Sequence, residues 1–188
     1  SMVLAVLEAH CGVRFATPDE RPLHDVFTCL HYRTTLPQAG GRLVRNAERF
    51  LLDGQTVVID DYLEVRPETA PRLAALASAG RLQVGPWMVL MDEYMVSGET
   101  MVRDLQHGIA RATELGAVMD VGYLPDMFGH VAQMPQLFRL VGFEHAVVWR
   151  GVPSAIDRTA FWWRAPDGSR VRAEYLFGSY SNGRDIPN

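Results

Sequence analysis

Two charged side chains follow apolar runs in the second half of the chain. Asp126 comes directly after an apolar run that ends in Tyr-Leu-Pro125, and Arg150 comes directly after the run Ala146–Trp149. In α/β enzymes a strand fixes the position of a catalytic group, and the loop at its carboxyl end builds the site. A carboxylate and a guanidinium at the ends of successive strands therefore predict a pocket for a polar ligand, with Asp126 as the catalytic carboxylate.

Less demanding interpretations of the same residues remain open. Aspartate often caps the segment that follows a strand, so Asp126 could serve only as a cap. Arg150 could form an ordinary surface ion pair, and Phe128 could be plain core packing. His130 could be a second donor near the site or a structural residue of the turn. The segment after another expected strand contains Trp87, Asp92 and Glu93. These side chains could line the pocket, or they could serve packing and local capping.

Composition limits the class of protein. The chain has 188 residues, 48% of them hydrophobic, which suffices for one domain with a sizeable core. Its formal net charge is −4, from 18 basic and 22 acidic residues, which argues against nucleic-acid binding. No apolar run approaches the length of a membrane span. Cys11 and Cys29 form no CxxC pair, which together with the absence of a signal peptide favours a cytoplasmic protein.

Short strands and helices alternate along the sequence. Strands are expected over 2–7, 49–52, 82–84, 121–125 and 145–149, and a hairpin over 161–177 about the turn at 166–168. Helices are expected over 56–65, 67–79, 97–115 and 134–141; the long one begins at a Ser97 cap and ends at Gly116. The buried stripe of that long helix is expected to be Met101, Leu105, Ile109 and Ala112. This alternation predicts an α/β fold with a mostly parallel sheet or barrel.

Several ordered segments resemble the catalytic domain of glycoside hydrolase family 38, the α-mannosidases. They are Gly85–Glu93, Ser97–Glu99, Gly122–His130 and Trp149–Val152, and the similarity extends upstream to Phe50–Gln55 and Asp61–Pro67. The resemblance covers roughly residues 48 to 178. It implies that residues 1–188 form part of the family's seven-stranded β/α barrel, as the N-terminal piece of a longer catalytic domain.

The resemblance also implies roles for individual residues. Asp126 matches the nucleophile of a retaining mechanism, which also binds the active-site zinc. A retaining glycosidase pairs that carboxylate with an acid/base group roughly 5 to 5.5 Å away, and the family's general acid falls beyond residue 188. Arg150 matches an arginine that contacts the nucleophile and would hold the carboxylate ionised and oriented. Phe128 matches an aromatic residue of the sugar site, and Asp185 an aspartate that hydrogen-bonds the sugar.

The N-terminal segment departs from the family pattern. His10 stands at a zinc-ligand histidine, but Gly12 stands where a ligand aspartate belongs, and Glu8 replaces a further histidine. Phe15 holds the place of a tryptophan that stacks on the sugar. A catalytic zinc site needs at least three protein ligands, and His10 with Asp126 supplies two. His10 could equally be a strand-end histidine without metal.

Three functional classes follow from these observations. The first is a zinc-dependent retaining α-mannosidase that acts on terminal α-mannosyl linkages of mannosides or oligosaccharides, and that could form homo-oligomers. The second is a non-catalytic carbohydrate-binding or scaffold descendant, which Gly12 favours. The third, a metal-dependent polysaccharide deacetylase, needs paired histidines about one helical turn apart, which the six histidines do not offer. Without the general acid, residues 1–188 alone are expected to turn over mannosides poorly.

Overall fold

The computed structural model describes residues 50–176 of the chain. Its strands are β1 (Phe50–Leu51), β2 (Leu82–Gln83), β3 (Val121–Leu124), β4 (His145–Val148), β5 (Ala160–Arg164) and β6 (Arg170–Tyr175). Its helices are α4 (Val57–Val65), the 3-10 helix η1 (Pro67–Thr69), α5 (Ala70–Ser78), α6 (Gly98–Leu115) and α7 (Met134–Leu140). None of these helices is both long and apolar enough to cross a membrane.

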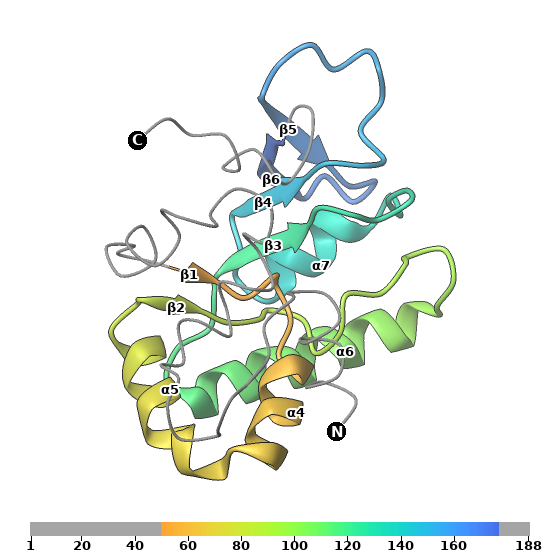
Figure 1. Ribbon diagram of the computed structural model, residues 1–188. Helices are drawn as coiled ribbons and strands as arrows, with labels where there is room; N and C mark the ends of the chain where they lie inside the picture. The colour runs from red at the N-terminus through yellow and green to blue at the C-terminus, as the bar shows by residue number, and fades with distance from the viewer. Residues whose placement is uncertain (1–49, 177–188) are drawn as a thin grey trace, which may run out of the picture.

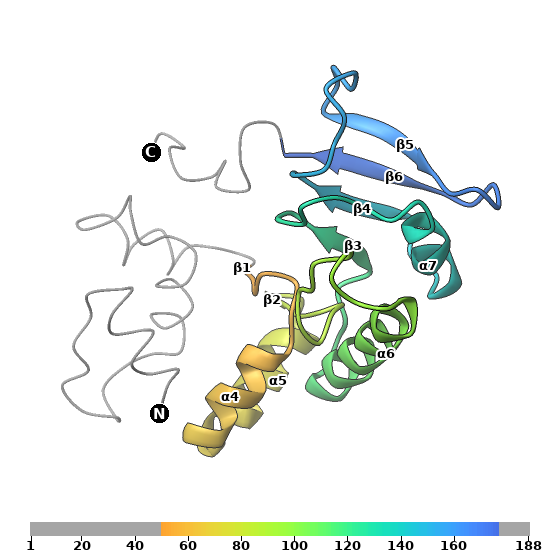
Figure 2. The same ribbon diagram turned by 90° about the vertical axis from the view of Figure 1, so that its right-hand side faces the viewer.

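The strands form two sheets in the described part of the chain. β1 pairs with β2 in parallel, and a second sheet has the order β3-β4-β6-β5. The pairs β3–β4 and β4–β6 are parallel, whereas β5 and β6 form the antiparallel hairpin. In Figures 1 and 2, α4 and α5 lie beside β1 and β2, and α7 lies on one side of the larger sheet. The predicted α/β class with mostly parallel strands is confirmed, whereas a closed seven-stranded barrel is not formed by residues 50–176 and stays a prediction.

Local sequence accounts for the ends of the long helix α6. The hydroxyl of Ser97 accepts a hydrogen bond from the backbone N–H of Thr100 at 3.1 Å, so one of the free donors of the first turn is satisfied. Gly116 ends the helix at φ 129°, a backbone conformation that side chains rarely adopt. The helix of 67–79 was expected to be continuous. Instead, Pro67 starts a 3-10 turn and α5 begins at Ala70.

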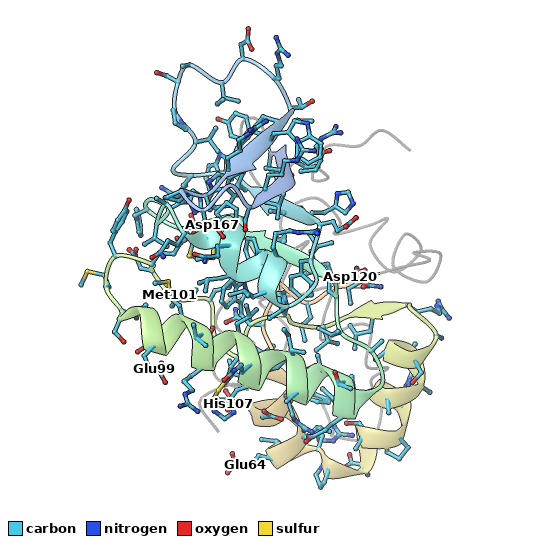
Figure 3. The ribbon with its side chains drawn as sticks, turned by 180° about the vertical axis from the view of Figure 1, so that it is seen from behind. Glu64, Glu99, Met101, His107, Asp120 and Asp167 are labelled. Carbon is cyan, nitrogen blue, oxygen red and sulfur yellow. The ribbon has the colours of Figure 1, made fainter. Side chains whose placement is uncertain are left out.

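The buried side of α6 differs at one position from the predicted stripe. Met101, Leu105 and Ala112 are buried as expected, but Gly108 is buried where Ile109 was expected, and Ile109 is only partly buried. A side chain at Gly108 would begin 2.2 Å from the carbonyl carbon of Trp87, so helix and loop meet backbone to backbone. In Figure 3, Met101 lies on the side of α6 that faces the sheet, and Glu99 and His107 project from the other side.

Two clusters of buried side chains make up the core. One lies among β1, β2, α4, α5 and the end of α6, and consists of Leu52, Ile59, Leu73, Ala77, Leu82, Val84, Ala112 and Leu115. The other joins the start of α6 to α7 and the larger sheet, and its members include Trp87, Met101, Leu105, Leu124, Phe138, Ala146, Val148 and Val171. Trp87 and Phe138 meet edge to face in this second cluster, with their ring centroids 6.0 Å apart. The helix α6 contributes to both clusters.

Candidate active site

Asp126 and Arg150 lie side by side at the carboxyl ends of β3 and β4. The two strands are in parallel register, with Leu124 opposite Val148, so the second residue after each strand falls at the same edge of the sheet. The backbone N–H of Arg150 donates to the carbonyl oxygen of Pro125 at 3.1 Å, which fixes the two loops against each other. The Nε–H of Arg150 donates to Oδ1 of Asp126. The predicted contact between these two residues is therefore present.

The guanidinium of Arg150 also contacts two aromatic rings. Its central carbon lies 5.3 Å from the centroid of Phe128 and 4.6 Å from that of Trp149. Cations favour the negative face of an aromatic ring, so both contacts stabilise this position of the side chain. Phe128 is 74% exposed, so the alternative that it only packs in the core is wrong.

A cavity of about 220 Å³ opens beside Asp126. Its lining includes three aspartates, Asp53, Asp92 and Asp126, together with Phe128. Its walls are completed by Leu90, Met91, Pro125 and Met127. Carboxylates accept hydrogen bonds from hydroxyl groups, and an aromatic ring offers an apolar face, so this lining suits a small polyhydroxylated ligand.

Asp53 was not recognised from the sequence as a cavity residue. The pair Asp53-Gly54 predicted only the turn that closes the first described strand, and a turn is what the structure has there. Asp53 adopts a positive φ of 39°, and the hydroxyl of Tyr123 donates to its Oδ1 at 3.4 Å. Positive φ is uncommon for residues other than glycine, although aspartate tolerates it. The orientation of this turn toward β3 depends on packing between strands, which the local sequence does not encode.

The buried Glu93 and the partly buried His130 form a pair that contacts the backbone of Arg150. The side chain of Glu93 is fully buried, and its Oε1 lies 2.7 Å from Nδ1 of His130. The other carboxylate oxygen of Glu93 accepts from the backbone N–H of Val131 at 2.7 Å. Nε2 of His130 lies 2.9 Å from the carbonyl oxygen of Arg150. The interpretation of His130 as a second donor near the site is thus consistent with its contacts.

Asp104 of α6 holds the loop that forms one wall of the cavity. Its Oδ1 accepts from the N–H of Val89 at 2.9 Å, and its carbonyl oxygen accepts from the N–H of Met88 at 3.3 Å. Burial raises the pKa of the Asp104 carboxyl from 3.8 to about 6, although the hydrogen bond from Val89 and the charge of His107 act in the opposite direction. Leu90, Met91 and Asp92 of the same loop line the cavity.

The other residues predicted to form the site have different positions. Trp87 is fully buried, and its Nε1–H donates to the carbonyl oxygen of Tyr123 at 2.9 Å, so the packing interpretation is correct for it. Asp126 caps no helix, because α7 begins only at Met134. The remaining predictions, His10 as a metal ligand and Phe15 and Asp185 as sugar contacts, lie outside the described residues.

The chain is similar to a known protein family and to several proteins of that family. The family described as glycosyl hydrolases family 38, N-terminal domain, matches residues 32–187. A protein of Halalkalibacterium halodurans with a provisional assignment as a mannosylglycerate hydrolase is 38% identical in an alignment of 155 positions, which covers 76% of this chain and 17% of that protein. The mouse protein alpha-mannosidase 2C1 is 36% identical in an alignment of 115 positions, which covers 58% of this chain and 11% of the mouse protein.

A solved structure shares the fold at a similar level of identity. It is an alpha-mannosidase from Enterococcus faecalis, with a TM-score of 0.72 and 36% identity over 78% of this chain and 17% of that structure. The chain therefore spans about a sixth of the length of these bacterial relatives.

Proposed function

The chain belongs to glycosyl hydrolase family 38, and from this membership we propose that it is part of a retaining glycosidase that cleaves terminal α-mannosyl linkages. One observation carries the proposal: the Asp126 carboxylate lies at the carboxyl end of β3, lines the cavity, and is held by Arg150. The α-mannosidase relatives support a mannosyl group as the part of the substrate that is recognised. The resemblance extends this proposal to a closed β/α barrel in the complete enzyme.

The proposed reaction follows from the chemistry of a carboxylate beside an anomeric carbon. An oxygen of Asp126 attacks that carbon and forms an ester bond while the bond to the leaving-group oxygen breaks. The leaving oxygen takes a proton from a general acid, which the resemblance locates beyond Asn188. Water then hydrolyses the ester, and two inversions give net retention. Arg150 donates to Oδ1 and so fixes the orientation of the carboxylate.

For the complete enzyme, we propose that the active site binds a zinc ion. Within residues 50–176, no three His, Cys, Asp or Glu side chains are grouped so that they could hold a metal ion. Of the two ligands expected from the sequence, Asp126 lies at the cavity and His10 lies outside the described residues. The described residues alone therefore do not fit a zinc ion, and the proposed roles of Asp126 and Arg150 do not depend on one.

A second candidate function is a carbohydrate-binding module without catalysis. It is favoured by Gly12, which stands where the family resemblance places a zinc-binding aspartate. Such a module would use the same cavity, in which the carboxylates of Asp53, Asp92 and Asp126 accept hydrogen bonds from sugar hydroxyls. The two candidates differ in one chemical event, the formation of a covalent bond to Asp126.

A covalent trap tests the proposed function directly. We expect a fluorinated mannosyl fluoride to form an ester on Asp126, because fluoride leaves without a proton from a general acid and the ring fluorine slows hydrolysis of the ester. Mass spectrometry of the intact chain and of its peptides would show the added sugar on the peptide that contains Asp126. The Asp126→Asn variant should remain unlabelled.

A matched control separates catalysis from binding. Asp92→Asn alters another carboxylate of the same cavity and should still be labelled, because Asp92 has no covalent role in the proposal. Absence of any adduct on the wild-type chain, with saturable binding of mannose by calorimetry, would contradict the glycosidase proposal and support the binding module.

A further inference from the structure

The pair Glu93–His130 is linked to the proposed nucleophile through a single residue, Arg150. The carbonyl oxygen of Arg150 contacts His130 at 2.9 Å, and the side chain of the same Arg150 donates to Asp126. A hydrogen bond on the backbone of Arg150 restricts where its side chain can begin. We propose that Glu93 and His130 are positioning residues that set the guanidinium of Arg150, and through it the carboxylate of Asp126. This inference rests on the proposed function only in giving Asp126 the role of nucleophile.

Hydrogen-bond chemistry determines which atoms of His130 are donors. A carbonyl oxygen can only accept, so Nε2 of His130 must carry a proton and donate it to Arg150. Nδ1 faces a carboxylate oxygen of Glu93 at 2.7 Å. This contact fixes the rotation of the ring about the bond that joins it to Cβ. A carboxylate that orients a histidine, which in turn orients a functional group, is a common way of supporting a site.

Packing leaves the ring of His130 little freedom. Its ring centroid lies 4.9 Å from that of Trp163, in an edge-to-face arrangement. On another side, a side chain at Gly151 would begin 2.8 Å from Cδ2 of His130, so the backbone after Arg150 lies directly against the imidazole. The hydroxyl of Tyr94 donates to the carbonyl oxygen of His130 at 2.9 Å and secures its backbone. A displacement of the ring would therefore be passed to the segment 150–151.

The carboxylate of Glu93 is committed to this arrangement. Its side chain is fully buried, and one oxygen contacts His130 while the other accepts from the N–H of Val131. A buried carboxylate is unfavourable unless its oxygens have partners, so the loop that contains His130 must adopt this path for Glu93 to be accommodated. Glu93 itself does not line the cavity. Its position is therefore explained by its contacts with His130 and Val131, without a direct contact with the sugar.

Two substitutions at position 130 separate the two contacts of the ring. The amide nitrogen of glutamine falls near the place of Nε2, so His130→Gln keeps a donor to Arg150 and loses the contact with Glu93. The amide nitrogen of asparagine falls near the place of Nδ1, so His130→Asn keeps the contact with Glu93 and loses the donor to Arg150. Both variants are neutral and polar, and they differ by one methylene.

The readout is the Nε–H resonance of Arg150 in nitrogen-15 NMR spectra of the full chain, assigned with Arg150→Lys. In the wild type this resonance should shift when Asp126→Asn removes the carboxylate. We expect His130→Asn to move the resonance to the position seen in Asp126→Asn, and His130→Gln to leave it near the wild-type position. A resonance that is unchanged in both variants, or equally displaced in both, would overturn the inference.

Thermal unfolding of each variant is measured first. If His130→Asn does not fold, Glu93→Asp replaces it, because a shorter carboxylate draws the ring away from Arg150 while both ring nitrogens remain. The same movement of the Arg150 resonance is then expected, and its absence would overturn the inference.

The NMR readout needs no turnover. A chain that shows the expected shifts but forms no ester on Asp126 would refute the proposed function and leave the positioning role intact.

Discussion

Asp104 holds the loop at one wall of the cavity, and the protonation of its carboxyl group makes the free energy of unfolding depend on pH. Its pKa in the folded chain is about 6, against an ordinary value of 3.8, because burial disfavours the charged form. The folded state therefore binds this proton more tightly than the unfolded state does. The contribution of Asp104 to the free energy of unfolding is complete below about pH 4 and is lost as the pH rises through about 6.

We expect Asp104→Asn to flatten the pH dependence of stability between pH 4 and pH 7, because the amide does not titrate. The measurement is urea denaturation at several pH values in this range, for the wild type and the variant. The control is Asp120→Asn, which changes an exposed carboxylate just before β3 (Figure 3) and should leave the wild-type slope in place. Equal slopes in Asp104→Asn and the wild type would contradict the proposed effect of burial.

At the scale of single residues, the sequence predicted the groups whose position depends on a strand end. Asp126 and Arg150 follow directly after apolar runs, so parallel pairing of β3 with β4 was enough to bring them together. Glu93 was expected after another strand end as a possible pocket residue, but it does not line the cavity, whereas Asp53 was expected only in a turn and does line it. The first lies on a loop and contacts His130, which is 37 residues further along the chain, and the second lies in a turn that contacts Tyr123.

At the scale of elements, α6 approaches the loop at 86–88 without any side chain between them. A methyl group at Gly108 would begin 2.2 Å from the backbone of Trp87, whereas at Gly98, the first residue of the same helix, it would meet nothing within 4 Å. Alanine favours a helix over glycine by up to about 1 kcal/mol. Forcing an extra methyl group into a packed contact costs about 1 to 3 kcal/mol.

The two glycines should therefore respond in opposite directions to the same substitution. Gly98→Ala is expected to leave the free energy of unfolding unchanged or to raise it slightly, and Gly108→Ala to lower it by up to about 2 kcal/mol, because the packing cost exceeds the gain in helix propensity. Chemical denaturation of both variants provides the measurement. Stabilisation by Gly108→Ala would show that helix and loop are not in contact at this position.

Periodicity and capping residues sufficed to predict most of the described helices and strands. The Ser97 cap, the Gly116 terminus and the hairpin about residues 166–168 are found as predicted. The break between η1 and α5 was missed, because a proline at position 67 is compatible with either kind of first turn. The burial of Gly108 was missed as well, since its cause is a distant loop and not the pattern within the helix.

At the scale of the whole molecule, the resemblance to family 38 predicts that residues 1–188 carry the nucleophile without the general acid. We expect the purified chain to release the leaving group of an aryl mannoside very slowly, because loss of acid/base assistance typically costs about 10²- to 10⁴-fold in rate. The assay compares the wild type with Asp126→Asn, with the zinc content of each determined in parallel. Efficient release that Asp126→Asn abolishes would contradict this expectation.

The mostly parallel sheet was predictable from the alternation of strands and helices, and the hairpin at its edge from the turn Pro166-Asp-Gly168. The division into a two-stranded and a four-stranded sheet was not. Local sequence identifies strands, but which of them pair is decided by contacts between segments far apart in the chain. β1 and β2, for example, pair across some thirty residues of helix and turn.

The helix α6 belongs to both core clusters, with Met101 and Leu105 in one and Ala112 and Leu115 in the other. It follows that neither cluster can come apart without disturbing the packing of the other. The two sheets are thereby joined into one cooperative unit, although they share no strand. A disturbance that begins near β1 and β2 can therefore travel along a single helix to the loop that frames Asp126.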